Sequence, residues 1–477
     1  MPRFHTVSPR LSNCIASNAS LSFGPSLPTM ADASSPPQTR LSPGAVRQIG
    51  FLPLLALFYG YTASGPFGYE EIFSSSGPGM ALIFLTFVPF FWSIPISFAS
   101  AEMNSILPVQ GGFYRWSRAA FGDFWGFQCG WWNWSGTFLL NSLYGVLFMD
   151  YIKDYISITP NEKWAGAALV LIILAAMNAR GIQVAGRLAI ILQVAIFLPV
   201  AWLCLVSLFH WHFNPILPFV PPGHPFGSVF GKGLALAMWD YAGYEQLSSC
   251  TAEMKDPQRT FVRVLGWNTP MNILTYTLPA TLALAVLGNW QDWQTGYIVT
   301  ASQLVGGTAL GVAMLVASII GVASLSNATI LYTTRIPAAM AEDGYLPQWL
   351  GKIHPRYGTP ARAIAVSTIV YCILAKFPVV DLVNIYIWTR IATSMMTVLA
   401  AWQLRRKMPN AKRNFKIPMG NFGLLCVVIL PAALCAVKVY YSEPIVFHWA
   451  PVLLALGPIA YVILRFAFHL KPTPNQT

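Results

Sequence analysis

Three carboxylates in this sequence lie inside long apolar runs, where an ionisable side chain is costly. Glu70, Asp240 and Glu245 each stand in a stretch that is apolar enough to cross a membrane, and Glu71 adjoins the first of them. Ionisable residues at membrane depth usually face a bundle interior or a water-filled pathway, where they pair with cations or relay protons. The residue types and positions therefore predict cation or proton binding inside a bilayer.

Each of these acids accompanies a sequence that interrupts a helix. The run 59–70 contains three glycines and Pro66, which removes a backbone donor and clashes with the preceding turn. The run 238–245 combines Asp240, a glycine and three aromatic residues. Irregular backbone survives in a membrane only where it is packed within protein or lines a cavity. Two interrupted helices, five helices apart, predict an inverted-repeat secondary transporter, whereas two Pro/Gly kinks with packing roles are the alternative.

The composition sets the environment in which these residues work. The chain has 477 residues, of which 55% are hydrophobic, 14% aromatic and only 10% charged. The charged fraction is too small to cover a soluble globule and too small for a disordered chain. The net charge of +12 is distributed between the apolar runs, which indicates membrane topology and not nucleic-acid binding. The seven cysteines form no C-x-x-C pair, so we expect no metal site, no disulfide and no cofactor.

Long apolar runs alternate with short polar loops along the chain, as expected for an all-α membrane protein. A membrane helix needs about 20 apolar residues. Twelve predicted helices satisfy this pattern, at 50–72, 80–103, 124–151, 164–179, 188–209, 230–254, 264–287, 298–332, 360–377, 382–404, 422–437 and 444–464. If both termini are cytosolic, most Lys and Arg residues fall in the inner segments, which supports twelve crossings. The first ten would form a five-plus-five inverted repeat, followed by two extra helices.

The two ends of the chain differ from this transmembrane region, which we assign to residues 44–470. Residues 1–43 are rich in Ser, Pro and Thr and cannot form a packed core. We interpret them as a disordered cytosolic tail, with an organelle transit peptide as the alternative, because Arg residues greatly outnumber acids there. Met30 could also be the true start. Residues 471–477 form a short cytosolic tail, and the plasma membrane is the expected location.

Four motifs in order resemble the amino acid–polyamine–organocation superfamily. They are the loop between helices 2 and 3 at 101–122, the loop after helix 4 at 178–181, the end of helix 6 at 252–259 and the segment after helix 8 at 335–347. Further stretches at 64–70, 91–95, 125–128 and 147–151 resemble the plant-type polyamine uptake transporters. The resemblance implies a substrate held between helices 1, 3, 6, 8 and 10.

The composition of the two breaks favours a cationic substrate. Amino acid transporters of this superfamily bind the substrate carboxylate on free backbone N–H groups at the helix 1 break, and Pro66 deletes one such donor. Carboxylates and aromatic rings suit the ammonium groups of a polyamine such as putrescine or spermidine. The predicted substrate-binding residues are Ser64, Gly65, Glu70, Asn141, Trp239, Asp240, Tyr241, Tyr244, Glu245 and Arg390.

Two departures from the family pattern leave alternatives open. Helix 3 carries Leu140 beside Asn141 where relatives carry an acid, and helix 10 also lacks its expected acid. Helix 10 contains Arg390 instead, which either neutralises one of the acids or holds a substrate carboxylate. A neutral or cationic amino acid is therefore the alternative substrate.

The coupling ion and the functional class also have alternatives. Glu70 or Asp240 is the candidate proton carrier, because a buried carboxyl group can hold a proton. Sodium would need oxygen ligands from helices 1 and 8, which Ser318, Ser324 and Ser326 could supply. The seven histidines are scattered, which disfavours a membrane enzyme. A sensor with the same fold that binds without transporting is a further alternative.

Overall fold

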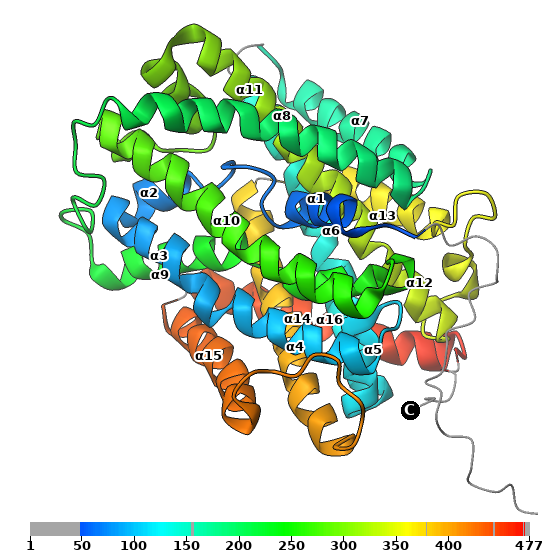
Figure 1. Cartoon of the computed structure of the whole chain (residues 1–477). Helices are drawn as coiled ribbons and strands as arrows, with labels where there is room; N and C mark the ends of the chain where they lie inside the picture. Colours follow the sequence, from blue (N-terminus) through cyan, green and yellow to red (C-terminus); the bar gives the residue numbers. More distant parts are fainter. Residues whose placement is uncertain (1–47, 154–156, 378, 442–443, 471, 473–477) are drawn as a thin grey trace, which may run out of the picture. The chain divides into compact units, whose positions relative to one another are not determined.

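The computed structural model describes residues 48–153, 157–377, 379–441, 444–470 and 472. The predicted tail at 1–43 lies outside these residues, as does all of 471–477 except residue 472. Within the described ranges the chain is helical, and extended pairing is limited to an isolated bridge between Ile49 and Met254. The all-α class predicted from the sequence is confirmed for this part of the chain (Figure 1).

Sixteen α-helices are described. They are α1 (Phe51–Thr62), α2 (Glu71–Ser76), α3 (Pro78–Phe91), α4 (Ser93–Ile106), α5 (Gly112–Phe121), α6 (Asp123–Lys153), α7 (Pro160–Asn178), α8 (Ile182–Leu208), α9 (Phe226–Asp240), α10 (Pro257–Leu287), α11 (Tyr297–Thr333), α12 (Arg335–Glu342), α13 (Ala361–Leu374), α14 (Val379–Lys407), α15 (Gly420–Tyr440) and α16 (Pro444–Val462). The tighter or wider turns are the 3₁₀ segments η1 (Tyr244–Glu253), η2 (Trp290–Asp292) and η3 (Gln348–Gly351), and the π-helical η4 (Ile463–Ala467).

Both predicted helix breaks are confirmed. The first helix ends at Thr62, and the chain then runs without regular structure to α2, with left-handed backbone at Ser64 (φ 53°) and Gly65 (φ 107°). The sixth predicted helix ends at Asp240 and resumes as the 3₁₀ segment η1, after Gly243 in the left-handed region (φ 96°). The second half of the range 230–254 is therefore not α-helical, in contrast to the expectation for a simple span.

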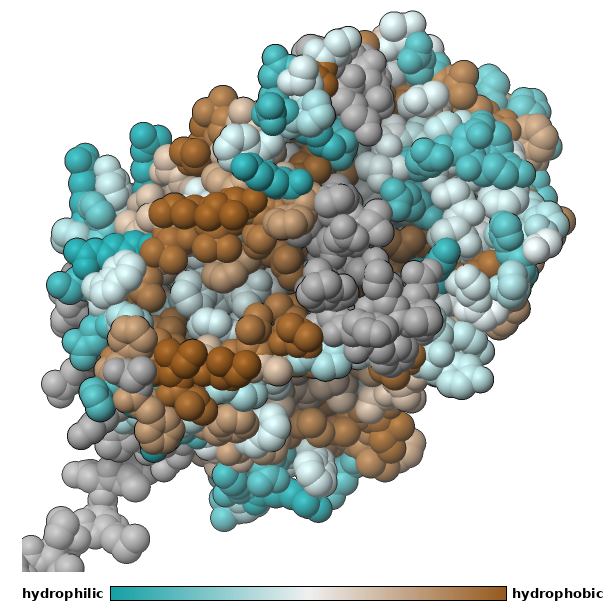
Figure 2. Space-filling model, turned by 180° about the vertical axis from the view of Figure 1, so that it is seen from behind, coloured by the Kyte–Doolittle hydropathy of each residue, from teal (hydrophilic) through white to brown (hydrophobic). Residues whose placement is uncertain are grey.

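The described residues contain six helices that are long and apolar enough to cross a membrane. They are 78–106, 160–178, 185–208, 257–287, 297–342 and 420–440, and three shorter apolar helices lie at 51–62, 361–374 and 451–466. Several of these helices expose large apolar side chains, as expected where a protein meets lipid. In Figure 2, hydrophobic side chains gather across the middle of one face and hydrophilic ones toward its edges.

The central helix of the bundle, α6, has several buried polar side chains. It packs against α14, α11, α5, α7, α13 and α16. It carries Gln128, Asn133, Thr137 and Asn141, all of which are buried. Neighbouring helices shield these polar groups from lipid, and polar side chains between membrane helices hydrogen-bond across the interface. The polar groups of α6 are therefore buried within the bundle.

The Gly111–Gly112 pair of the loop between the second and third predicted helices has a packing role. A Cβ atom on Gly112 would lie 2.1 Å from Ser248 Oγ and 2.8 Å from Ser248 O, because the start of α5 approaches η1 closely. The Phe113 N–H donates a hydrogen bond to Ser248 Oγ at 3.0 Å. Only glycine allows this approach, which fixes the break-containing segment η1 against α5.

We expect Gly112→Ala to lower stability by about 1–3 kcal/mol, because overpacking forces a backbone shift between α5 and η1. The measurement is the thermal midpoint of the detergent-purified protein. Gly266→Ala is the matched control, since a Cβ there meets no atom within 4 Å. Equal midpoints for the two variants would contradict the assigned packing role.

Candidate functional site

A small cavity of about 30 Å³ lies where the two broken helices meet. Its volume is of the order of one or two water molecules. The cavity is lined by residues of α1 and its break, of α9 and its break, and of α6, α10, α11 and α14: Tyr61, Thr62, Ala63, Phe67, Gly68, Trp239, Asp240, Ala242, Leu140, Tyr144, Leu147, Tyr276, Leu325 and Tyr386. Asp240 is the charged residue among them, and aromatic rings provide much of the wall.

Asp240 is the last residue of α9, and its carboxyl group is buried without full hydrogen bonding. The residue is 7% exposed, and its Oδ2 atom has no hydrogen-bond partner among the described residues. The cavity also receives the last residues of α1, Tyr61 and Thr62. Both half-helices therefore present their C-terminal ends, where the helix dipole is negative, to the cavity. A dipole arrangement of this kind and an incompletely bonded carboxylate favour a cation.

Glu70 is not among the residues that line the cavity and follows the first break in the sequence, directly before α2. The residue is fully buried, and its Oε1 accepts hydrogen bonds from the Tyr151 hydroxyl and the Gly296 N–H, each at 3.2 Å. Its Oε2 has no partner among the described residues. Glu70 interacts electrostatically with Asp240, so the two carboxyl groups belong to one region of the bundle. The structure thus brings together two of the three acids that the sequence singled out.

Glu245, the third acid, is already neutralised by a basic side chain. Its Oε1 forms an ion pair with Arg390 Nη2 and accepts a hydrogen bond from Ser394 Oγ at 2.7 Å. Both charged side chains are almost completely buried. Of the two roles left open for Arg390, the structure shows the first, in which it neutralises an acid.

The predicted residues Ser64 and Gly65 are not among the residues that line the cavity. Ser64 Oγ lies 3.5 Å from Gln193 Nε2, and the same amide donates to Ser324 Oγ at 3.0 Å. A Cβ on Gly65 would collide with Phe67 and Ile196. The side chain of Gln193 thus ties the first break to α8 and α11. Ser324, considered above as a sodium ligand, is an acceptor in this contact.

Asn141, Tyr241 and Tyr244 also lie outside the cavity lining. Asn141 Oδ1 accepts a hydrogen bond from Ser326 at 3.1 Å. The Tyr241 hydroxyl donates to the Leu85 carbonyl at 2.6 Å, and the Tyr244 hydroxyl accepts from Asn272 at 2.8 Å. These side chains connect helices and do not face the cavity. Of the ten predicted substrate-binding residues, Trp239 and Asp240 line it.

Sequence reasoning missed the tyrosines of the wall. Tyr61, Tyr144, Tyr276 and Tyr386 line the cavity and come from four different helices. A helical period could have indicated one of these positions, because Leu140, Tyr144 and Leu147 are spaced to lie on one face of α6. Which of the many tyrosines in the chain reach the cavity depends on helix packing, which no local pattern encodes.

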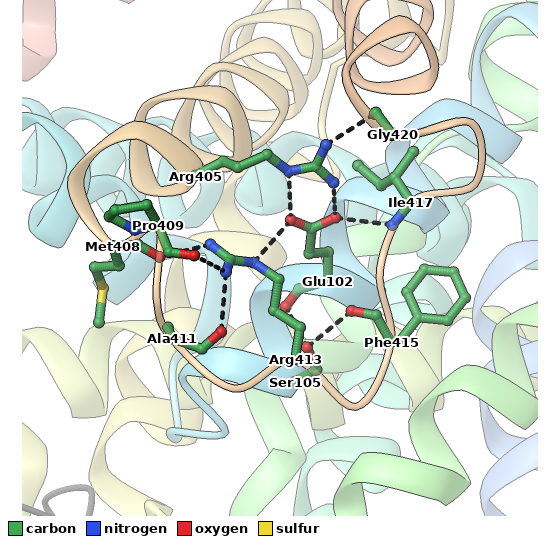
Figure 3. Close-up of polar contacts among 10 residues, drawn as sticks. All are labelled: Glu102, Ser105, Arg405, Met408, Pro409, Ala411, Arg413, Phe415, Ile417 and Gly420. Atoms are coloured by element: carbon green, nitrogen blue, oxygen red, sulfur yellow. Dashed lines mark hydrogen bonds and ion pairs between the residues drawn. The ribbon is translucent and has the colours of Figure 1, made fainter.

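A separate ion cluster joins the end of α4 to the end of α14 and the loop that follows (Figure 3). Glu102 is fully buried and pairs with Arg405 and Arg413. Its Oε1 accepts from Arg405 Nε at 2.8 Å and from Arg413 Nε at 3.2 Å, and its Oε2 accepts from the Ile417 N–H at 2.8 Å. Each carboxylate oxygen therefore has partners, as a stable buried charge requires.

Two further ion clusters connect segments that are distant in the sequence. Arg335, at the start of α12, pairs with Glu253 at the end of η1, with a contact of 2.9 Å between Nη2 and Oε2. Arg115 of α5 binds Asp343 with both Nε and Nη2 at 3.0 Å and also pairs with Glu342. These pairs fix the break-containing segment η1 and the loop helices α5 and α12 to the bundle.

Comparison with known proteins agrees with this architecture. The family model for amino acid permeases matches residues 49–458. The chain is 29% identical to Polyamine transporter RMV1 of Arabidopsis thaliana over 414 residues, which cover 86% of this chain and 83% of that protein. It is 28% identical to Polyamine transporter PUT1 of Oryza sativa subsp. japonica over 435 residues, covering 89% and 80%. A probable polyamine transporter of A. thaliana is 28% identical over 451 residues, covering 93% and 86%. The chain is thus a member of the amino acid permease family.

Proposed function

We propose that this protein is a secondary active transporter that moves polyamines such as putrescine and spermidine across a membrane by proton symport. The observation that carries the proposal is the Asp240 carboxylate, which lines an aromatic-walled cavity between two broken helices with an oxygen left unpartnered. The names of the plant relatives support polyamines as the substrate class.

The surroundings of Asp240 favour an ammonium group over a zwitterion. Tyr and Trp faces attract cations, and the C-terminal ends of α1 and α9 add negative potential. The lining described above contains no Lys or Arg, and Arg390 is paired with Glu245. A substrate carboxylate would therefore find no cationic partner in the lining. A neutral or cationic amino acid is the second candidate, which the family match supports.

The proposed architecture is a twelve-span bundle with a five-plus-five inverted repeat and two appended helices. The breaks after α1 and after α9 support this repeat, because they occupy corresponding positions in its two halves. The distribution of basic residues supports cytosolic termini. We place the protein in the plasma membrane, with the lipid bilayer, the proton and a small-molecule substrate as its partners.

The cavity is too small for a polyamine as it stands, so binding requires the wall to open. A closed site between two rigid half-bundles is expected in alternating access, in which one repeat rocks against the other around the substrate. The substrate site would then widen when the helices of the first break separate from α6 and α14.

The test is uptake into liposomes that contain the purified protein. We expect radiolabelled putrescine and spermidine to accumulate under an inward proton gradient, and unlabelled polyamines to compete. Uptake of leucine or arginine without uptake or competition by polyamines would refute the substrate assignment. Polyamine binding without net flux would instead identify a sensor.

We expect Glu70→Gln to abolish concentrative uptake while exchange of internal for external putrescine continues at a lower rate, because the amide attracts an ammonium group less strongly than the carboxylate does. The amide keeps the shape of the side chain and still accepts from Tyr151 and Gly296, but it cannot take up or release a proton. The measurement compares accumulation under a proton gradient with exchange at equal pH. Loss of both activities would assign Glu70 to folding or to substrate binding alone, and retention of both would exclude it as the proton carrier.

A further inference from the structure

The buried ion pair between Glu245 and Arg390 has no part in the proposed binding of substrate to Asp240. We propose that Arg390 acts as a built-in cation that neutralises Glu245. The site then binds two ammonium groups of a polyamine, and a third ammonium group adds no affinity. This inference rests on the proposed function, because it concerns which polyamine the same site prefers.

Two tyrosines of the cavity wall interact with the ion pair. Tyr386, which lines the cavity, precedes Arg390 by one helical turn on α14 and interacts with it. Tyr61, which also lines the cavity, interacts electrostatically with both Arg390 and Glu245. Any ammonium group that moved past these two tyrosines would therefore reach the ion pair.

The partners of the Glu245 and Arg390 atoms determine whether the ion pair attracts such an ammonium group. Glu245 Oε1 is taken by Arg390 and Ser394, whereas Oε2 and Arg390 Nε have no partner among the described residues. A second cation approaching Oε2 would be repelled by the guanidinium group at close range, in surroundings of low dielectric constant. The neutral pair thus offers a free oxygen but no net attraction.

Two carboxylates other than Glu245 are available near the cavity, and each can bind one ammonium group. Asp240 and Glu70 each have one carboxylate oxygen without a partner, and the two groups interact electrostatically. Glu71, next in the chain, accepts a hydrogen bond from Thr295 at 2.8 Å and is partly exposed. Two uncompensated carboxylates attract a diamine as strongly as a triamine, whose third ammonium would lack a partner.

Removing the Arg390 guanidinium group should leave the Glu245 carboxylate available to bind an ammonium group. In liposomes we expect Arg390→Met to raise the ratio of kcat/KM for spermidine to that for putrescine by about tenfold, the value of one added charge-assisted contact. Arg390→Lys keeps the cation and should leave the ratio at its wild-type value. The double variant Glu245→Gln, Arg390→Met frees no carboxylate, so its ratio should also match the wild type.

A ratio that stays unchanged in Arg390→Met while putrescine is still transported would overturn the inference. A ratio that rises equally in the double variant would assign the change to altered packing and overturn it as well. The wild type gives an independent test that needs no variant: putrescine and spermidine should compete with inhibition constants within about threefold, and tenfold tighter inhibition by spermidine would refute the two-ammonium site. If no polyamine is transported or competes at all, the proposed function itself fails.

Discussion

Asp240→Asn should reduce the kcat/KM of putrescine uptake by at least about 30-fold. Asp240 is the charged residue of the cavity lining, and its Oδ2 has no partner among the described residues. Losing one member of a desolvated charge pair costs about 2–5 kcal/mol, which corresponds to that change or a larger one. The amide has nearly the same volume as the carboxyl group, so the cavity wall should stay packed.

The measurement is initial uptake of labelled putrescine into liposomes, normalised to the amount of folded protein. Asp256→Asn is the matched control, because the Asp256 side chain is largely exposed and its only described ion pair is a 3.8 Å contact with the exposed Arg259. We expect this control to transport like the wild type. Wild-type uptake by Asp240→Asn would remove the observation on which the proposed function depends.

Glu102→Gln should destabilise the protein by about 3–5 kcal/mol, the usual cost of removing one member of a buried ion pair. The change leaves Arg405 and Arg413 without their shared carboxylate in a buried cluster. It also weakens the contact with the Ile417 N–H, which fixes the loop after α14. We expect a much lower thermal midpoint and a smaller yield of monodisperse protein in detergent.

Glu162→Gln serves as the control for this experiment. Glu162 is exposed and completes a capping box with Thr159 at the start of α7, a role that Gln can also fill. Its thermal midpoint should stay close to that of the wild type. A similar midpoint for Glu102→Gln would mean that the cluster contributes little to stability, and a normal midpoint with lost uptake would make it part of the transport cycle instead.

Local features of the chain could be predicted because their physical causes are local. Pro66 and the glycines around it lower the local helix propensity, and α1 ends at Thr62, four residues before Pro66. Asp240 and Gly243 mark the second break for the same kind of reason. Apolar runs that alternate with polar loops predict membrane helices before any packing is known.

Other features were missed because they depend on neighbours distant in the sequence. The motif at 101–122 predicts a loop, but this stretch contains the helix α5. The apolar pattern predicts one helix at 80–103, whereas the structure divides this range at Trp92 into α3 and α4. The tyrosines of the cavity wall come from four helices, and none is next to another in sequence. Asn141, Tyr241 and Tyr244 have residue types suited to binding, yet their hydrogen bonds join helices to one another.

The sequence by itself determined that this chain is an all-helical membrane protein with two interrupted helices and acids beside both interruptions. Only the tertiary structure decided which acid is neutralised. Glu245 and Arg390 are 145 positions apart, and the sequence does not indicate which partner either residue has. The physical reason is that helix breaks follow from backbone stereochemistry within a few residues, whereas charge compensation follows from which helices pack together and at what register.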